Sequence, residues 1–282
     1  MAAVSRRIPG ELADELRRVA EQVAGEAAEF VRSRRAQLFG PAAGPTEAVR
    51  SKSSPTDPVT LADTETEWLV RDRLSRLRPG EAILGEEQGG ASGVPGAVSW
   101  VVDPIDGTVN FIYGIPAYAV SLAAQVDGVS VAGAVADVCG GRVYSAAIGR
   151  GASVSVGAQR TALRCTAVAE LSMALVGTGF GYEPRRRAAQ AALLAALLPM
   201  VRDVRRIGSA SLDLCAVAAG RLDAHYEHGL NLWDWAAGAL IAAEAGAVVV
   251  LPDRPAGLLV AAAPGVAGEL IEALGRHAPP MP

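Results

Sequence analysis

A short apolar run that leads straight into two aspartates constrains the fold of this chain more than any other feature. Residues 98–102 are mostly apolar and are followed at once by Asp-Pro-Ile-Asp-Gly-Thr at residues 103–108. A run of this length predicts a buried strand, so both carboxylates are expected to emerge at the end of that strand. Two carboxylates on one tight turn suit a hard cation such as Mg²⁺.

The two residues after the second aspartate point to phosphate chemistry. If a helical turn begins at Gly107 and Thr108, their backbone amides can bind a phosphate group. A cation site beside a phosphate site is the equipment of phosphoryl hydrolysis. Asp-Pro and Asp-Gly are also common turn dipeptides, so the string taken alone has a purely structural explanation as well.

Three further acidic segments are spread along the chain. Residues 83–87 form a short apolar run that ends in two glutamates, and residues 231–238 place Asp234 in the first turn of an apolar helical pattern. Residues 52–63 mix loop formers with acids, Asp57 and Asp63 among them, just before another helical segment. Each segment alone is also explained by a solvated loop or by an acid that caps a helix.

Taken together, these four segments resemble the inositol monophosphatase family, the Mg²⁺-dependent, lithium-sensitive phosphatases of sugars and polyols. The resemblance covers residues 52–247. It is carried by Asp-Pro-Ile-Asp-Gly-Thr-Val-Asn-Phe at residues 103–111 and by Trp-Asp-Trp-Ala-Ala-Gly at residues 233–238, which match the two signatures of the family. The resemblance implies an α/β fold, a five-layer αβαβα sandwich of the inositol monophosphatase and fructose-1,6-bisphosphatase type.

The resemblance also implies a cofactor of two to three Mg²⁺ ions. The first ion would be held by Glu86, Asp103 and the carbonyl group of Ile105. The second would be held by Asp103, Asp106 and Asp234, so that Asp103 bridges the two ions. A third, weaker ion would lie near Glu86.

The catalytic residues implied in the same way are Thr108, Asp63 and Glu86. Thr108 would hydrogen-bond the attacking water with the support of Asp63, and the amides of Gly107 and Thr108 would bind the phosphate. Hydrolysis would proceed by direct attack of a metal-activated water, without a covalent phosphoenzyme.

The residues expected to contact the alcohol part of the substrate come from the second half of the chain. They are Gly208, Ser209, Ala210, Glu227 and Asp234. Ser209 is equally explained as the start of a helix and Glu227 as a surface acid at a strand end. His225 and His228 flank Glu227, and we expect a core or surface role for both rather than metal ligation. No aromatic platform is evident near these residues.

The substrate expected is myo-inositol 1-phosphate or a similar small phosphorylated polyol. Histidinol phosphate is the main alternative, because the Glu227 carboxylate can pair with an ammonium group as well as accept hydrogen bonds from hydroxyls. Fructose 1,6-bisphosphate and adenosine 3′,5′-bisphosphate are further alternatives. An alternative from a different class is a non-catalytic regulatory binding protein that kept the fold.

Composition limits the partners and the compartment. The net charge of −4 argues against nucleic acid as the main partner. The three cysteines, Cys139, Cys165 and Cys215, show neither a disulfide framework nor zinc spacing, which indicates a reducing compartment. Residues 1–10 lack the apolar segment of a signal peptide, and no apolar stretch is long enough to span a membrane. We therefore expect a cytoplasmic protein, and the resemblance implies a homodimer.

The order of predicted elements divides the chain loosely in two. Helices are expected at residues 11–39 and 61–77, followed by strands at Ile83 and Val98 and by a strand run over residues 117–147 in which Asp127-Gly128 marks a hairpin. From residue 174 to residue 251, strands and helices alternate. We expect an N-terminal α+β part, residues 1–150, that carries the metal-site acids, and a C-terminal α/β part, residues 151–282, in one cooperative unit.

Overall fold

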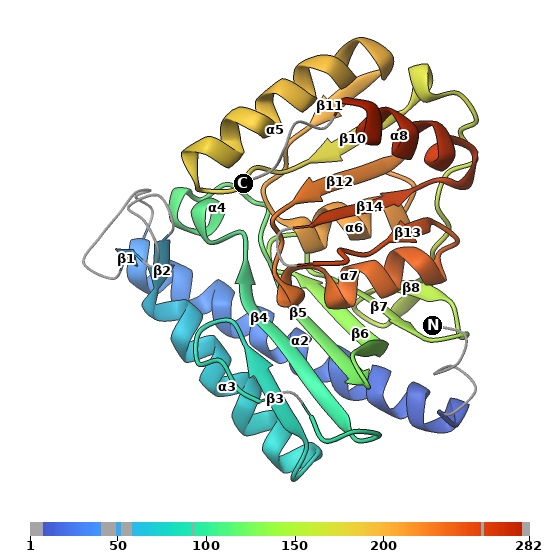
Figure 1. The fold of residues 1–282 in the computed structure, drawn as a ribbon. Helices are drawn as coiled ribbons and strands as arrows, with labels where there is room; N and C mark the ends of the chain where they lie inside the picture. Colours follow the sequence, from blue (N-terminus) through green and yellow to red (C-terminus); the bar gives the residue numbers. More distant parts are fainter. Residues whose placement is uncertain (1–7, 41–48, 52–57, 92, 255–256, 278–282) are drawn as a thin grey trace.

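A computed structural model describes residues 8–40, 49–51, 58–91, 93–254 and 257–277 (Figure 1). Within these ranges, the chain is a mixed α/β protein with one seven-stranded and one five-stranded sheet, besides a two-stranded ribbon of β1 (Val49–Ser51) and β2 (Pro58–Thr60). Lys52 and Asp57 lie outside the described residues. No helix among the described residues is both long and apolar enough to cross a bilayer.

Five layers alternate between helices and sheets, as Figure 1 shows. Helices α2 (Gly10–Phe39) and α3 (Leu61–Leu77) cover the outer face of the seven-stranded sheet. Helices α6 (Ala210–Ala218) and α7 (Leu232–Glu244) lie between the two sheets, and α5 (Pro184–Leu197) and α8 (Pro264–His277) cover the far face of the five-stranded sheet. The expected αβαβα sandwich is therefore confirmed.

The seven-stranded sheet is a meander that is antiparallel except for its first pair. Its strands in spatial order are β3 (Ala82–Gly85), β4 (Val98–Asp106), β5 (Ala119–Val126), β6 (Val129–Asp137), β7 (Arg142–Ala147), β8 (Ala152–Val156) and β9 (Gln159–Ala162). The Asp127-Gly128 hairpin is confirmed, because both residues have positive φ between β5 and β6. Strands β8 and β9 lie beyond the strand run predicted over residues 117–147, and β9 is fully exposed and has no apolar pattern.

The five-stranded sheet mixes parallel and antiparallel pairs. Its spatial order is β11 (Asp203–Arg205), β10 (Leu175–Thr178), β12 (Ala224–His228), β14 (Leu258–Ala262) and β13 (Val248–Val250). The predicted alternation of strands and helices over residues 174–251 is confirmed. Strand β14 and helix α8 follow it and were not predicted. Two short 3₁₀ segments, Leu171–Met173 and Leu198–Met200, complete this half.

Helix α2 shows how the first helical layer forms. Its apolar residues recur at steps of three and four, and Leu16, Ala20, Val23 and Ala27 are buried against the sheet. Helix α3 begins at a capping box, in which the Asp63 carboxylate accepts a hydrogen bond of 2.8 Å from the Thr60 amide. The two helices therefore cover the outer face of the seven-stranded sheet, to which β4 belongs.

Strand β4 bends where its two aspartates lie. Asp103 pairs with Ser121 of β5 and Asp106 pairs with Ala119, so β4 carries one residue more than β5 over this stretch. Pro104 lies inside the irregularity, where a residue without an amide hydrogen does not weaken the ladder. A bulge of this kind re-aims side chains, and here it turns both carboxylates toward the middle helical layer.

The expected division at residue 150 stays a prediction. The first sheet extends to Ala162, and helix α7 contacts strands of both sheets. On β6, a Cβ atom at Gly133 would lie 3.1 Å from the Cβ of Ala237, so the small residues let α7 approach the sheet closely. The position of α7 therefore depends on both halves of the chain.

A buried glutamate holds the loop that follows β3. The fully buried Glu67 of α3 accepts hydrogen bonds from the amides of Glu87 (2.7 Å) and Gln88 (3.2 Å) and pairs with Arg71 at 2.8 Å. Two of these donors are backbone amides of the loop, so the Glu67 carboxylate fixes the loop against α3. We conclude that Glu67 sets the position of the neighbouring Glu86.

Glu67→Gln is expected to lower the free energy of unfolding by about 2 kcal/mol, because a buried donor loses its charged acceptor. Urea unfolding monitored by circular dichroism measures this change. The matched control is Glu65→Gln, since the Glu65 carboxylate pairs with Arg34 but is 33% exposed, and an exposed pair contributes at most about 1 kcal/mol. Equal losses in the two variants would contradict the anchoring role of Glu67.

Candidate metal and phosphate site

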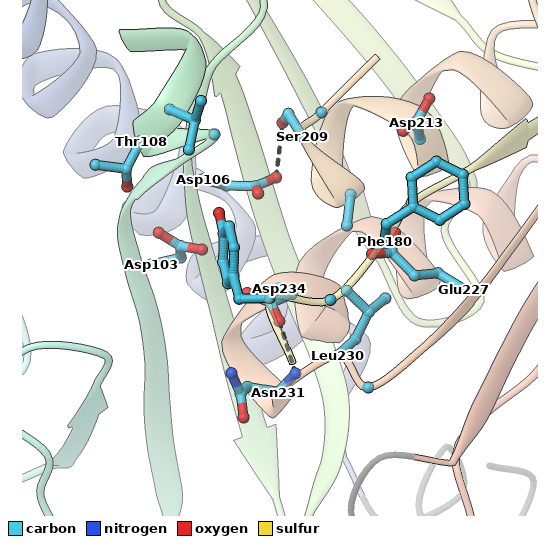
Figure 2. A pocket seen from close by; sticks show the side chains of 18 of the residues that line it. Asp103, Asp106, Thr108, Phe180, Ser209, Asp213, Glu227, Leu230, Asn231 and Asp234 are labelled. Atoms are coloured by element: carbon cyan, nitrogen blue, oxygen red, sulfur yellow. Dashed lines mark hydrogen bonds between the residues drawn. The ribbon is translucent and has the colours of Figure 1, made fainter. Parts of the chain in front are cut away.

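A cavity of about 1150 Å³ opens where the end of β4 faces the middle helical layer. Figure 2 shows Asp103, Asp106 and Thr108 at one end of it and Glu227 with Phe180 at the other. All the predicted site residues line the cavity except Asp63, which lies directly behind Thr108. The structure therefore brings together segments that are far apart in the sequence.

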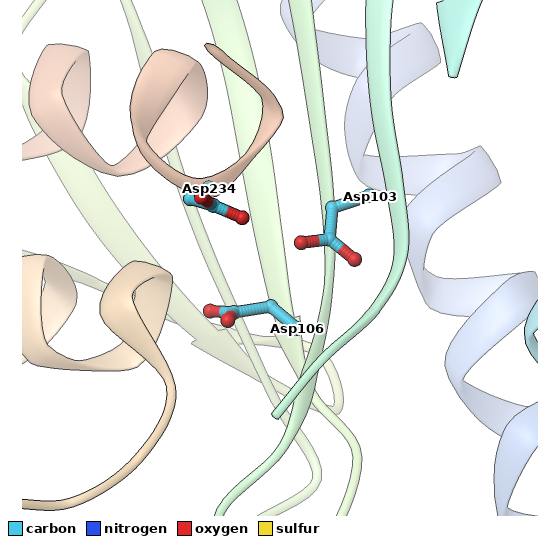
Figure 3. Close-up of side chains that lie close together, drawn as sticks. All are labelled: Asp103, Asp106 and Asp234. Atoms are coloured by element: carbon cyan, nitrogen blue, oxygen red, sulfur yellow. The ribbon is translucent and has the colours of Figure 1, made fainter. Parts of the chain in front are cut away.

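Three carboxylates meet at the β4 end of the cavity. One oxygen each of Asp103, Asp106 and Asp234 lies within 4.8 Å of the others (Figure 3). Asp103 and Asp106 are buried and come from the bulged end of β4. Asp234 comes from the first turn of α7, where its carboxylate also accepts a hydrogen bond of 2.6 Å from the Asn231 amide. It is thus both a helix cap and a member of the cluster.

The three carboxylates repel one another. Burial raises the pKa of Asp103 well above its usual value, and the negative charges of Glu86, Asp106 and Asp234 raise it further. Burial likewise raises the pKa of Asp234, with the charges of Asp106 and Glu86 as further causes. Hard oxygen ligands gathered at this density fit a divalent cation, which relieves the repulsion.

Asp106 differs from the other two because hydroxyl groups hold it. Burial raises the pKa of Asp106, while hydrogen bonds from Ser211 and Ser209 act in the opposite direction. The Ser209 hydroxyl donates to it at 2.7 Å, and the Ser211 amide donates at 2.7 Å. Ser211 was not among the predicted site residues, because only the packing of α6 on β4 reveals its contact.

A hydroxyl and a second carboxylate lie beside the cluster. The Thr108 Oγ1 atom is 3.1 Å from Asp63 Oδ1 and 3.1 Å from the carbonyl oxygen of Ile105. Asp63 is fully buried, and its other oxygen is engaged by Thr60. The predicted pairing of Thr108 with Asp63 is therefore present in the structure.

A short helix, α4 (Thr108–Tyr113), begins directly after Gly107, as predicted for the phosphate-binding turn. Gly107 has a φ of 100°, and a Cβ atom there would lie 2.9 Å from the carbonyl oxygen of Ala117. Asn110 ties this turn to the loop before α6, because its amide donates to the carbonyl groups of Ala117 (2.8 Å) and Ile207 (2.9 Å). Glycine fits at position 107 because it tolerates the positive φ and has no Cβ atom to collide with the Ala117 carbonyl.

Glu86 lies in the loop after β3 and lines the same cavity. Its amide donates to the carbonyl of Val102 at 3.2 Å, which joins the loop to β4. Its carboxylate influences Asp103 but does not belong to the compact group of three among the described residues. The structure therefore places Glu86 at the edge of the cluster.

The residues expected to contact the alcohol part of the substrate, Gly208, Ser209, Ala210 and Glu227, all line the cavity. The sequence showed no aromatic platform near these residues, but the cavity is also lined by Tyr113, Phe180, Tyr182 and Trp233. Arginines, including Arg186 and Arg206, do so as well. Trp233 stands in the first turn of α7 and Tyr113 at the end of α4, whereas Phe180 and Tyr182 come from the segment between β10 and α5. Only their packing around the cavity brings them together with Glu227.

Comparison with known proteins identifies relatives over nearly the whole chain. The sequence model of a family described as "Inositol monophosphatase family" matches residues 12–278. An inositol-1-monophosphatase of Mycobacterium leprae is 64% identical over 280 residues, which are 95% of this chain and 96% of that protein. The solved structure of Mycobacterium tuberculosis SuhB has a TM-score of 0.80 at 62% identity and covers 93% of this chain and 96% of its own.

A more distant relative carries a different name. The Nus factor SuhB of Pasteurella multocida is 37% identical over 224 residues, which are 77% of this chain and 82% of that protein.

The match of the family model and the identity to an inositol-1-monophosphatase show that the chain belongs to the inositol monophosphatase family, and its enzyme class is that of the phosphoric monoester hydrolases. The resemblance drawn from the two signature strings is confirmed.

The acidic cluster predicts how stability depends on pH and on cations. Because the pKa values of Asp103 and Asp234 are raised in the folded protein, the folded state binds more protons than the unfolded state above the usual aspartate pKa. The metal-free protein should therefore lose stability as the pH rises through this window. Mg²⁺ should raise Tm, and by more at higher pH, since protons and cations compete for the same oxygens.

Asp103→Asn tests this account without an activity assay. The amide removes a charge but keeps an oxygen for the Ile105 amide, which donates to Asp103 at 3.0 Å. We expect a higher Tm for the metal-free variant at alkaline pH and a loss of most of the Mg²⁺-induced rise. Differential scanning fluorimetry measures both, with Asp14→Asn as the control, because the Asp14 side chain lies on α2, far from the cluster, and is 46% exposed. A wild-type Tm that does not respond to Mg²⁺ would exclude the cluster as its site.

Proposed function

We propose that this member of the inositol monophosphatase family hydrolyses myo-inositol 1-phosphate, or a similar small sugar or polyol phosphate, to the free alcohol and inorganic phosphate. The observation that carries the proposal is the group of three carboxylates within 4.8 Å of one another at the wall of a cavity. The Thr108–Asp63 pair adjoins the group, and Glu227 lies at the far end of the cavity.

Two to three Mg²⁺ ions are the proposed cofactor. Glu86, Asp103 and the Ile105 carbonyl would hold one ion, and Asp103, Asp106 and Asp234 would hold another. Once bound, such ions neutralise the phosphate, make a nearby water more acidic and stabilise the leaving oxygen. Without cations, the carboxylates would repel a phosphate dianion, so activity should require them.

The chain's own residues orient the reactants. The Thr108 hydroxyl is placed to accept a hydrogen bond from the attacking water, while it donates its own hydrogen to Asp63. A water held in this way attacks phosphorus directly, and no side chain forms a bond to the phosphate. The amides of Gly107 and Thr108 bind the phosphate oxygens at the start of α4.

Glu227 is proposed to recognise the alcohol part. Its carboxylate, 12% exposed, can accept hydrogen bonds from two neighbouring ring hydroxyls. Gly208, Ser209 and Ala210 would contact the ring from the other side, with Asp234 between ring and phosphate. Histidinol phosphate remains the alternative substrate, because its ammonium group can pair with the same carboxylate.

The relatives named Nus factor support a second candidate from another class, a regulatory binding protein. An intact acidic cluster and the higher identity to an inositol-1-monophosphatase favour catalysis. We also propose a homodimer that works in the cytoplasm and is inhibited by Li⁺. The family resemblance supports the dimer and the lithium sensitivity, and the absence of disulfides among the described cysteines supports the compartment.

Thr108→Ala should lower kcat by roughly 10²-fold with little change in KM, because the hydroxyl acts on the attacking water rather than on substrate binding. Phosphate release from inositol 1-phosphate with Mg²⁺ measures the loss. Thr161→Ala, on the exposed strand β9, is the control. An unchanged kcat in folded Thr108→Ala would show that the hydroxyl only caps α4.

A substrate panel tests the polyol assignment. We expect kcat/KM to be highest for inositol 1-phosphate, above histidinol phosphate and adenosine 3′,5′-bisphosphate. Adenosine 2′-phosphate belongs in the panel because aromatic residues line the cavity. Glu227→Gln should lower kcat/KM for inositol 1-phosphate more than kcat/KM for p-nitrophenyl phosphate, which has no hydroxyls. A kcat/KM about tenfold higher for histidinol phosphate than for inositol 1-phosphate, about 1.4 kcal/mol, would reject the polyol assignment. If no substrate releases phosphate in a Mg²⁺-dependent way, the regulatory binding protein is favoured.

A further inference from the structure

A buried histidine lies between two carboxylates at the alcohol end of the cavity. His225 of β12 is fully buried. Its Nδ1 atom is 3.9 Å from Asp213 Oδ2, and its Nε2 atom is 3.5 Å from Glu227 Oε2. Both distances exceed a normal hydrogen bond, and neither ring nitrogen has another partner among the described residues. The contacts that hold this imidazole are therefore chiefly electrostatic, and they end at Glu227.

The neighbouring strand is built to leave room for this arrangement. Gly177 of β10 pairs with His225, and a Cβ atom there would lie 3.1 Å from the imidazole Nδ1 and 3.3 Å from Asp213 Oδ1. A Cβ atom at Gly179 would lie 2.2 Å from the carboxyl carbon of Glu227. The two glycines on one face of this segment thus open the space in which the three side chains meet.

The surroundings favour a positive imidazole. Burial alone would lower the pKa of His225, but the contact with Glu227 and the charge of Asp213 outweigh burial, and the pKa is raised. Burial raises the pKa of Asp213 to about 7, although His225 acts to lower it. The other charged groups that face this cluster are Asp106 and Arg206. An imidazole that is shared by two acids in this way restrains both.

We propose that His225 is a positioning residue, which holds the Glu227 carboxylate from behind, is itself held by Asp213, and so determines the selectivity of the cavity for polyol phosphates. The inference rests on the proposed role of Glu227 in binding hydroxyls. A glutamate side chain has several rotatable bonds, and its acceptor atoms select a hydroxyl pattern only if their direction is fixed. His225 supplies that restraint without touching the substrate.

The proposal separates binding of the alcohol from chemistry at phosphorus. His225 lies 3.5 Å from Glu227 and does not line the cavity. Thr108 and the three-carboxylate group lie at the end of the cavity opposite Glu227 (Figure 2). Loss of the imidazole should therefore raise KM for a polyol substrate and leave kcat nearly unchanged. A substrate without hydroxyls, such as p-nitrophenyl phosphate, should be hydrolysed as before.

The test is a double-mutant cycle on the full chain in the presence of Mg²⁺. His225→Phe keeps an aromatic ring and removes both nitrogens, and exposed His277→Phe is the matched control. We expect His225→Phe to lower kcat/KM for inositol 1-phosphate about tenfold, a loss of the size expected for a displaced positioning group. The double variant His225→Phe/Glu227→Gln should be no worse than Glu227→Gln alone. Equal losses on p-nitrophenyl phosphate, or losses that multiply in the double variant, would overturn the proposal.

A second measurement covers the case in which His225→Phe does not fold. The chain has three histidines, so the imidazole ¹⁵N resonances of the wild-type protein can be assigned. The His225 Nε2 resonance should shift in Glu227→Gln and again when inositol 1-phosphate binds in the presence of Ca²⁺. A resonance that responds to neither change overturns the proposal. A wild-type enzyme that hydrolyses p-nitrophenyl phosphate but not inositol 1-phosphate would instead reject the proposed function.

Discussion

Mutual repulsion among buried carboxylates is the constraint on which the rest of this structure depends. Asp103, Asp106 and Asp234 are held within 4.8 Å of one another, and the pKa values of Asp103 and Asp234 are raised well above normal. Such a group costs stability unless a cation or hydrogen bonds offset the charge. The bulge in β4 fixes the position of Asp103, and the capping turn of α7 fixes the position of Asp234.

The middle helical layer converts this local constraint into a cavity with two ends. Helix α6 supplies the serine donors that hold Asp106, and helix α7 supplies Asp234. Both helices pack between the sheets, so their first turns face the end of β4. The seven-stranded sheet therefore contributes Asp103 and Asp106 at one end of the cavity, and the five-stranded sheet contributes Glu227 at the opposite end.

The two ends of the cavity manage buried charge in different ways. At the end formed by Asp103, Asp106 and Asp234, the acids are crowded and suit a divalent cation that offsets their charge. At the other end, two acids flank an imidazole whose pKa they raise, because His225 lies between Asp213 and Glu227. The first arrangement favours binding of a phosphate with metal ions, and the second favours a fixed pattern of hydrogen-bond acceptors. In the proposed function, specificity and chemistry are thus placed on different elements.

The features that the sequence by itself determined depend on interactions between residues that are close together in the chain. The helices at residues 10–39 and 61–77, the strand that ends at Asp106 and the Asp127-Gly128 hairpin follow from periodicity, capping and turn chemistry within a few residues. The acids of the cluster were also evident, because they stand in two strings typical of one family. Each of these signals is complete within one short segment of the chain.

Only the tertiary structure decided which distant residues meet. The contact of Ser211 with Asp106, the aromatic wall that includes Phe180, and the place of His225 between two acids all depend on packing between elements. Strand β9 was missed for a related reason, since a strand is stabilised by its neighbours and needs no pattern of its own. Strand β14 was not predicted although Leu258–Ala262 is an apolar run. A histidine two residues before a glutamate in sequence points to no function until a strand pairing and a helix place a second carboxylate on its other side.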